Sequence, residues 1–113
     1  MDPMAERVAK NDAAFREANE EIGDRAAPTD VELVPFICEC ADPGCTEIVR
    51  LSLDDYERIR ADSRHFLNVP GHERSAAGFA QVIRRGDGYV VIEKQGEAGE
   101  IVEELDARGT LKK

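Results

Sequence analysis

The fold is decided by one stretch of the chain, residues 34–51, which read VPFICECADPGCTEIVRL. Two runs rich in β-branched residues stand on either side of the turn Asp42-Pro43-Gly44. β-Branched residues fit the pleated surface of a sheet, and proline followed by glycine favours a tight turn. We therefore predict a β-hairpin over this stretch.

Three cysteines lie inside the predicted hairpin. Residues two apart on a strand point to the same face, so Cys38 and Cys40 present their sulfurs together. The four-residue turn then places Cys45 roughly opposite Cys40 across the ladder. The three thiols are expected to converge at one end of the hairpin.

Converging thiols of this kind are typical of zinc sites, because thiolates are strong ligands and a turn fixes their spacing. The spacing here is C-x-C-x4-C, which differs from the C-x2-C pairs of zinc ribbons. His72, in the turn Pro70-Gly71-His72, is the expected fourth ligand. His65, Asp42 or water are the alternatives, and water would leave the site open and reactive. Glu39 is expected to point to the opposite face of the strand.

Two other interpretations of the cysteines remain open. Small thiols are among the most buried side chains, and Cys38 and Cys40 alternate with Val34 and Phe36 on one strand face, so they fit an ordinary core. The cysteines can also act as a redox pair with one thiol left over. A disulfide between Cys38 and Cys40 would close a strained small ring, which ranks the redox interpretation last.

A helix is predicted before the hairpin because apolar residues recur there at helical spacing. The apolar stripe consists of Met4, Val8, Phe15, Ala18 and Ile22. Gly23 is placed to end the helix, and residues 26–30 have the composition of a linker. The stripe is expected to pack on its own domain, with a partner or dimer helix as the alternative.

Further elements follow the first hairpin. Ser52 is placed to cap a short helix with Asp55 at its third position, and residues 66–69 form an extended piece. A second hairpin is predicted over residues 81–93 around the turn Gly86-Asp87-Gly88. After residue 96 the chain is mostly acidic, with Ile101, Val102 and Leu105 able to form one helical turn.

These elements predict an α+β fold, in which a small antiparallel sheet of two β-hairpins packs against one or two helices. At 113 residues the chain fits one core. It divides into an N-terminal amphipathic helix (1–25), a linker (26–33), an α+β domain with the cysteine cluster (34–95) and an acidic C-terminal tail (96–113). Aromatic residues make up only 5% and tryptophan is absent, so we expect modest stability, helped by a metal or a partner.

The net charge of −9 opposes binding to nucleic acid or to anionic membranes. Residues 57–85 are the exception, with 6 bases against 3 acids. Their arginines Arg58, Arg60, Arg64, Arg84 and Arg85 can frame an anion site, although pairing with the acidic N-terminal helix is the preferred interpretation. No run approaches the roughly 18 apolar residues of a membrane span. The N-terminus lacks the pattern of a signal peptide, so we expect a cytoplasmic protein with reduced thiols.

Enzyme signatures are thin. The sequence contains no G-x-S-x-G, no phosphate-binding glycine loop and no H-E-x-x-H. A nucleophile pair of Cys45 with His72 can be drawn, but no third group to orient it is evident. We therefore expect a binding role rather than an enzyme.

The segments CECADP (38–43), CTE (45–47) and PGHE (70–73) resemble an uncharacterised family of small bacterial proteins that carry CECADPxC and PGHE motifs. The likeness extends over most of the chain after the linker. It implies an intact domain and carries no activity with it.

Together these observations predict a small zinc-binding protein-interaction or regulatory module, with Cys38, Cys40, Cys45 and His72 as ligands. The acidic helix or the sheet surface would meet a protein partner. A metal-free thiol redox switch is the alternative, and a small metalloenzyme with an open coordination position ranks last.

Overall fold

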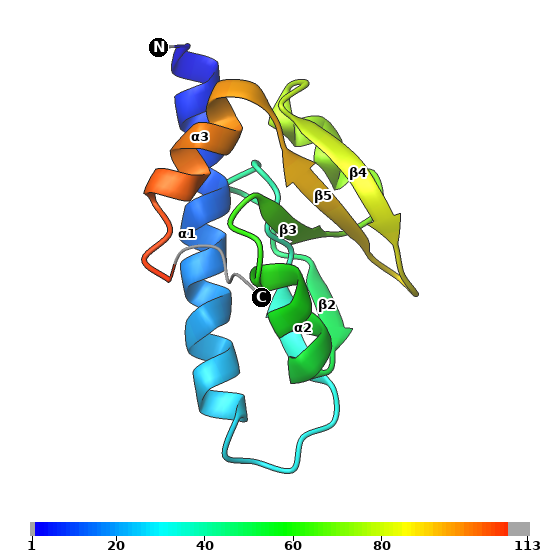
Figure 1. The fold of residues 1–113 in the computed structure, drawn as a ribbon. Helices are drawn as coiled ribbons and strands as arrows, with labels where there is room; N and C mark the ends of the chain where they lie inside the picture. The colour runs from blue at the N-terminus through cyan, green and yellow to red at the C-terminus, as the bar shows by residue number, and fades with distance from the viewer. Residues whose placement is uncertain (1, 109–113) are drawn as a thin grey trace.

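A computed structural model describes residues 2–108 and shows the α+β fold that the sequence predicts (Figure 1). The elements in chain order are α1 (Pro3–Ala26), β1 (Val34–Ile37), β2 (Ile48–Leu51), α2 (Leu53–Arg60), β3 (His65–Asn68), the 3-10 helix η1 (His72–Ala76), β4 (Ala80–Arg85), β5 (Val90–Lys94) and α3 (Gly96–Glu104). No helix in this part of the chain is both long and apolar enough to cross a membrane.

Both predicted hairpins are present, and each belongs to a sheet of its own. β1 and β2 pair antiparallel from Val34 opposite Leu51 to Ile37 opposite Ile48. The second sheet has the strand order β3-β5-β4, so the extended piece after α2 joins the second hairpin as a third strand. The backbone N–H of Glu39 donates to the carbonyl of Leu67 at 2.7 Å, which links the two sheets.

The three-stranded sheet separates two hydrophobic clusters. Phe66 and Ile92 face the cluster under α1 and α3, whereas their neighbours Leu67 and Val91 face the cluster under α2 and the first hairpin. This follows from the alternation of side chains along a strand. In the second cluster the rings of Phe36 and Tyr56 stack with centroids 4.2 Å apart. Both faces of this small sheet are therefore covered by a hydrophobic cluster.

Helix α1 packs on its own domain, but mostly through residues outside the predicted stripe. Met4 and Ala18 are exposed and Phe15 is only half-buried, so the predicted stripe is correct only for Val8, which is buried, and for Ile22, which packs against the second hydrophobic cluster. The buried residues are instead Ala5, Val8, Ala9, Asp12, Ala13, Arg16, Asn19 and Gly23. The small residues of this face fit close packing against α3, and its polar members have partners across the core.

Two of those partners explain why polar side chains are buried on α1. Asp12 forms an ion pair with Lys94 of β5, and both side chains are fully buried. Burial raises the pKa of Asp12 to about 7, against the opposing charge of Lys94. Arg16 lies over the ring of Phe66 at 4.9 Å and donates to the carbonyls of Ser63 and Val102.

The segment predicted as an acidic tail begins with a packed helix. Residues 96–104 form α3, which lies beside the first half of α1 (Figure 1). α3 is 9 residues long, so the segment forms more than the one helical turn expected, and Ala98 and Val102 are completely buried in it. The last residues of the predicted tail, 109–113, lie outside the described residues.

Asp106, just after α3, ties the end of the described chain to the first two helices. Arg60 donates to both oxygens of Asp106 and also to Glu20 of α1, as the predicted pairing of this arginine with the N-terminal helix requires. The hydroxyl of Ser63 donates to Asp106 at 2.6 Å. Burial alone would raise the pKa of Asp106, but these hydrogen bonds and the charges of Arg16 and Arg60 hold it well below its usual range.

We predict that Asp106→Ala lowers the free energy of unfolding at pH 7 by about 3 kcal/mol, because the buried charge of Arg60 loses a main partner. The folded pKa of Asp106 lies below its unfolded value, so its contribution is present above about pH 4 and is lost as the pH falls further. The difference between wild type and variant in urea denaturation should therefore shrink in acid.

Asp87→Ala is the matched control, since Asp87 lies exposed in the turn between β4 and β5. It should change stability by less than about 0.5 kcal/mol. An equal loss in both variants, or a difference independent of pH, would contradict this role for Asp106.

Candidate metal centre

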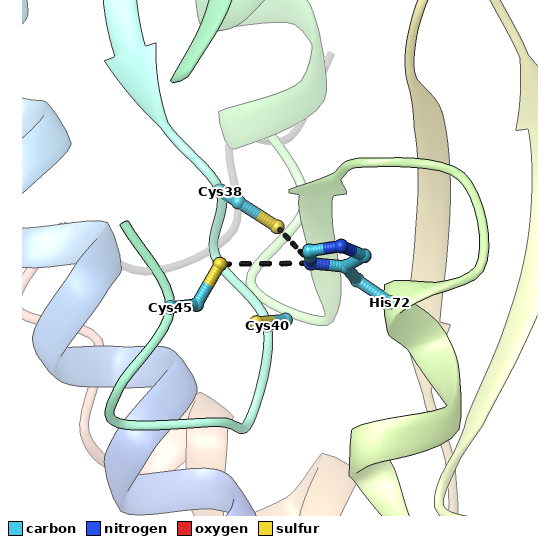
Figure 2. Close-up of side chains that lie close together, drawn as sticks. All are labelled: Cys38, Cys40, Cys45 and His72. Carbon is cyan, nitrogen blue, oxygen red and sulfur yellow. Dashed lines mark hydrogen bonds between the residues drawn. The ribbon is translucent and has the colours of Figure 1, made fainter. Parts of the chain in front are cut away.

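The structure brings together the four residues that the sequence analysis proposed as ligands. The ligand atoms of Cys38, Cys40, Cys45 and His72 all lie within 4.8 Å of one another. Figure 2 shows the His72 ring facing the sulfurs of Cys38 and Cys45, with Cys40 on the loop between these two cysteines. Cys38 and Cys40 are buried, whereas Cys45 and His72 are partly exposed. This arrangement can hold a metal ion.

The cysteines lie beyond the strands rather than on them. β1 ends at Ile37 and β2 begins at Ile48, so the prediction that Cys40 and Cys45 face each other across the ladder is wrong. One further bond, from the N–H of Cys38 to the carbonyl of Glu47 at 3.0 Å, extends the hairpin to the first cysteine. The remaining loop is long enough to turn all three sulfurs toward one point.

A turn centred on Asp42 returns the chain from Cys40 to Cys45. The Asp42 side chain accepts from the N–H of Gly44 at 2.9 Å, and its carbonyl accepts from the N–H of Cys45 at 3.1 Å. Asp residues favour such turns because the short side chain caps its own backbone. The Asp42 carboxylate is thus engaged in the turn, and it is not one of the four clustered ligand groups.

His72 is presented by a second tight turn. Gly71 has a φ of 92°, a left-handed conformation that side chains rarely adopt, and the N–H of His72 donates to the carbonyl of Val69 at 3.0 Å. Ser75 joins this turn to the cysteine loop, because its hydroxyl donates to the His72 carbonyl and accepts from the N–H of Ala41. The histidine is therefore aimed by its backbone.

The distances fit a single tetrahedral ion. His72 Nδ1 lies 3.6 Å from Cys38 Sγ and 3.5 Å from Cys45 Sγ (Figure 2). Bonds of about 2.3 Å from zinc to sulfur and about 2.0–2.1 Å from zinc to nitrogen, at tetrahedral angles, place such atoms about 3.6 Å apart. The two His72–sulfur distances thus match a tetrahedral zinc site, and all four ligand atoms lie within 4.8 Å of one another.

The surroundings of the sulfurs bear on their charge. Burial raises the pKa of the Cys38 and Cys40 thiols above their ordinary value. The N–H of Val69 donates to Cys38 Sγ at 3.2 Å, which opposes this effect and is the kind of bond that supports a thiolate ligand. Without a cation these two thiols stay protonated at neutral pH, and a bound metal ion would deprotonate them.

His65, the other histidine, lies outside the cluster. The sequence analysis gave it as an alternative fourth ligand, but it is the first residue of β3 and is not one of the four clustered residues. Its Nε2 lies 3.1 Å from a carboxylate oxygen of Glu93 and 3.5 Å from one of Asp62. Its ring is thus engaged on the three-stranded sheet.

Glu39 is the residue whose role sequence reasoning missed. As predicted, it points away from the sulfurs, but it is fully buried and highly connected. Its carboxylate accepts from the Tyr56 hydroxyl, from Asn19 Nδ2 at 3.0 Å and from the N–H of Leu67 at 2.9 Å. Asn19 also bonds the N–H and the carbonyl of Ile37. These bonds fix the C-x-C segment to α1, α2 and β3. The one signal in the sequence for this role was that Glu39 points away from the cysteines on either side of it.

The chain matches no protein-family model, no curated protein and no solved structure. The resemblance carried by the CECADPxC and PGHE motifs therefore stays a prediction. Function has to be argued from the four clustered side chains and from the surface around them.

We predict that Glu39→Ala lowers the free energy of unfolding by about 3 kcal/mol, because three buried donors lose their acceptor. It should also weaken zinc binding by roughly tenfold or more, as removal of groups that orient ligands does. Competition with a chromophoric chelator measures the affinity. Glu47→Ala, an exposed carboxylate of the same loop, is the control and should leave both quantities unchanged. Equal zinc affinity in the two variants would contradict the orienting role.

Proposed function

We propose that this chain is a small zinc-binding module that acts in protein interaction or regulation, with Cys38, Cys40, Cys45 and His72 as the ligands. The observation that carries the proposal is the convergence of three sulfurs and one imidazole nitrogen, all within 4.8 Å of one another. The four residues come from two loops that are distant in sequence, so their meeting is a property of the fold.

The chemistry of the donor set supports zinc. Thiolate and imidazole ligands in tetrahedral array are typical of zinc, whereas magnesium and calcium select oxygen ligands. A two-iron cluster would divide the ligands between two metals. Four ligand atoms within 4.8 Å of one another suit a single ion instead.

A structural role is favoured over a catalytic one. Catalytic zinc sites use three protein ligands and keep the fourth position for water, but here a fourth protein ligand, His72, is present. The ion would join the loop of the first hairpin to the turn that opens η1. For a core with few aromatic rings, such a bond contributes to the folding free energy directly.

The alternative, a metal-free thiol switch, has one observation in its favour, the partial exposure of Cys45. Reactive cysteines need a lowered pKa, however, and burial raises the pKa of both Cys38 and Cys40. The zinc proposal also accounts for His72, which the switch leaves without a role.

We predict one equivalent of zinc in protein purified without a histidine tag, measured by elemental analysis. His72→Ala should lose most of the metal, because the ion would keep only the three cysteine ligands. His65→Ala, the matched histidine change on β3, should retain it. Full zinc occupancy in His72→Ala, or a metal-free wild type with three freely titrating thiols, would overturn the proposal.

Chelation provides an independent measure. Removing zinc should lower the thermal midpoint by several degrees and make the three thiols reactive toward a thiol reagent, and restoring zinc should reverse both. Cys45→Ser should show the lower midpoint already without chelator. An unchanged midpoint after complete zinc removal would rule out a structural ion.

A further inference from the structure

A hollow lies between α2 and the three-stranded sheet, and none of its lining residues belongs to the candidate metal centre. It has a volume of about 180 Å³ and is lined by Arg58, Ile59, His65, Ile83, Arg84 and Val91. Pockets for drug-sized ligands begin at about 300 Å³, so this one suits a single side chain of a larger partner.

An irregularity in β4 shapes the hollow. Val82 pairs with Ile92 and Arg84 pairs with Val91, which leaves Ile83 as an extra residue. In a regular strand, consecutive side chains point to opposite faces, yet Ile83 and Arg84 both line the hollow. The bulge has re-aimed a side chain, a use of bulges that recurs beside binding sites.

The lining combines an apolar floor with positive charge. Ile59 and Val91 are buried, while Ile83 is 44% exposed. Arg84 and its neighbour Arg85 are exposed, and among the described residues neither forms an ion pair. Arg7, Arg50 and Arg74 are likewise without an ion pair among the described residues, and of these unpaired arginines Arg84 is the one that lines the hollow. A partner can supply an acidic group to it there.

β4 also offers its backbone. It has a neighbour on one side only, because the strand order is β3-β5-β4, whereas the open side of β3 is met by Glu39. Figure 1 shows β4 along the outer border of the sheet. An extended peptide laid against this strand can gain main-chain hydrogen bonds while one of its side chains enters a neighbouring pocket.

We propose that the hollow beside β4 is the docking site for an acidic peptide segment of a partner protein, with one apolar anchor residue between aspartates or glutamates. The anchor fills the space over Ile59, Ile83 and Val91. One flanking carboxylate pairs with Arg84, and another competes with Asp55, which lies 3.2 Å from Arg58, for that guanidinium. This assignment gives the proposed interaction role a place and a partner chemistry, and it does not require the metal ion.

Charge separates this partner from two others. Nucleic acid presents a long row of phosphates, which the net charge of −9 repels over most of the surface. A second copy of the chain brings the same net charge, and like charges oppose its approach. A short acidic segment meets Arg58 and Arg84 beside the hollow and avoids most of the acidic surface of the chain.

The test begins with selection from a random peptide library on the full zinc-loaded chain. Selected peptides should carry acidic residues around one leucine, isoleucine, methionine or phenylalanine. Measured by fluorescence anisotropy with a labelled selected peptide, Ile83→Ser and Arg84→Glu should each weaken binding by about tenfold or more. The matched surface changes Ile48→Ser and Arg50→Glu, both on the other sheet, should leave binding unchanged.

All four variants replace exposed residues, so their folding and zinc content should equal those of wild type. The peptide-binding test is therefore independent of zinc binding. Failure of the zinc proposal would not change its outcome, and failure of peptide binding would not contradict the zinc site. Three outcomes would overturn the proposal. The selected peptides could lack acidic residues, or the control changes could weaken binding as much as the test changes. Polyphosphate could also displace the peptide while Ile83→Ser has no effect on peptide binding.

Discussion

The structure depends on one buried carboxylate. Glu39 accepts hydrogen bonds from three separate elements, through Asn19 of α1, Tyr56 of α2 and the backbone of β3 at Leu67. Its own N–H completes a bridge between the two sheets. A buried polar group is costly unless all its bonding capacity is used, and here it is used to join three elements beside the hydrophobic cluster that contains Tyr56 and Leu67. The position of Glu39 between two cysteines couples this anchor to the metal centre, since fixing its backbone fixes theirs.

The candidate metal centre complements that anchor from the other side of the same loop. The carboxylate fixes the start of the loop to the core, and the proposed ion would fix the loop to the turn carrying His72. Ser75 adds a hydrogen-bonded link between the same two segments. Local turns supply most of the precision, because Asp42 and Gly71 each set a backbone conformation that aims a ligand. The proposed docking hollow shares none of its lining residues with the four clustered ligand residues, so binding of a partner and binding of metal use different side chains.

The sequence predicted what local chemistry controls. Both hairpins follow from β-branched runs around turn residues, and the helix cap at Ser52 bonds Asp55 as expected. The four clustered ligand residues were also predicted, because Cys38, Cys40 and Cys45 are close in sequence and His72 occupies a tight turn. What failed depends on partners far along the chain. The buried face of α1 contains Asp12 and Arg16, and hydropathy alone places such residues outside. The packing of α3 on α1 was equally invisible in its acidic composition.

The pairing of α1 with α3 has a consequence for synthesis of the protein. α1 is translated first and α3 last among the described elements, yet the two lie side by side, and the backbone N–H of Asp2 donates to Glu97. Asp12 therefore lacks its partner Lys94 of β5, and Arg16 lacks the carbonyl of Val102 in α3, through most of translation. Contacts between distant segments are slow to form and leave intermediates exposed. The nascent chain therefore completes its core only after α3 has left the ribosome.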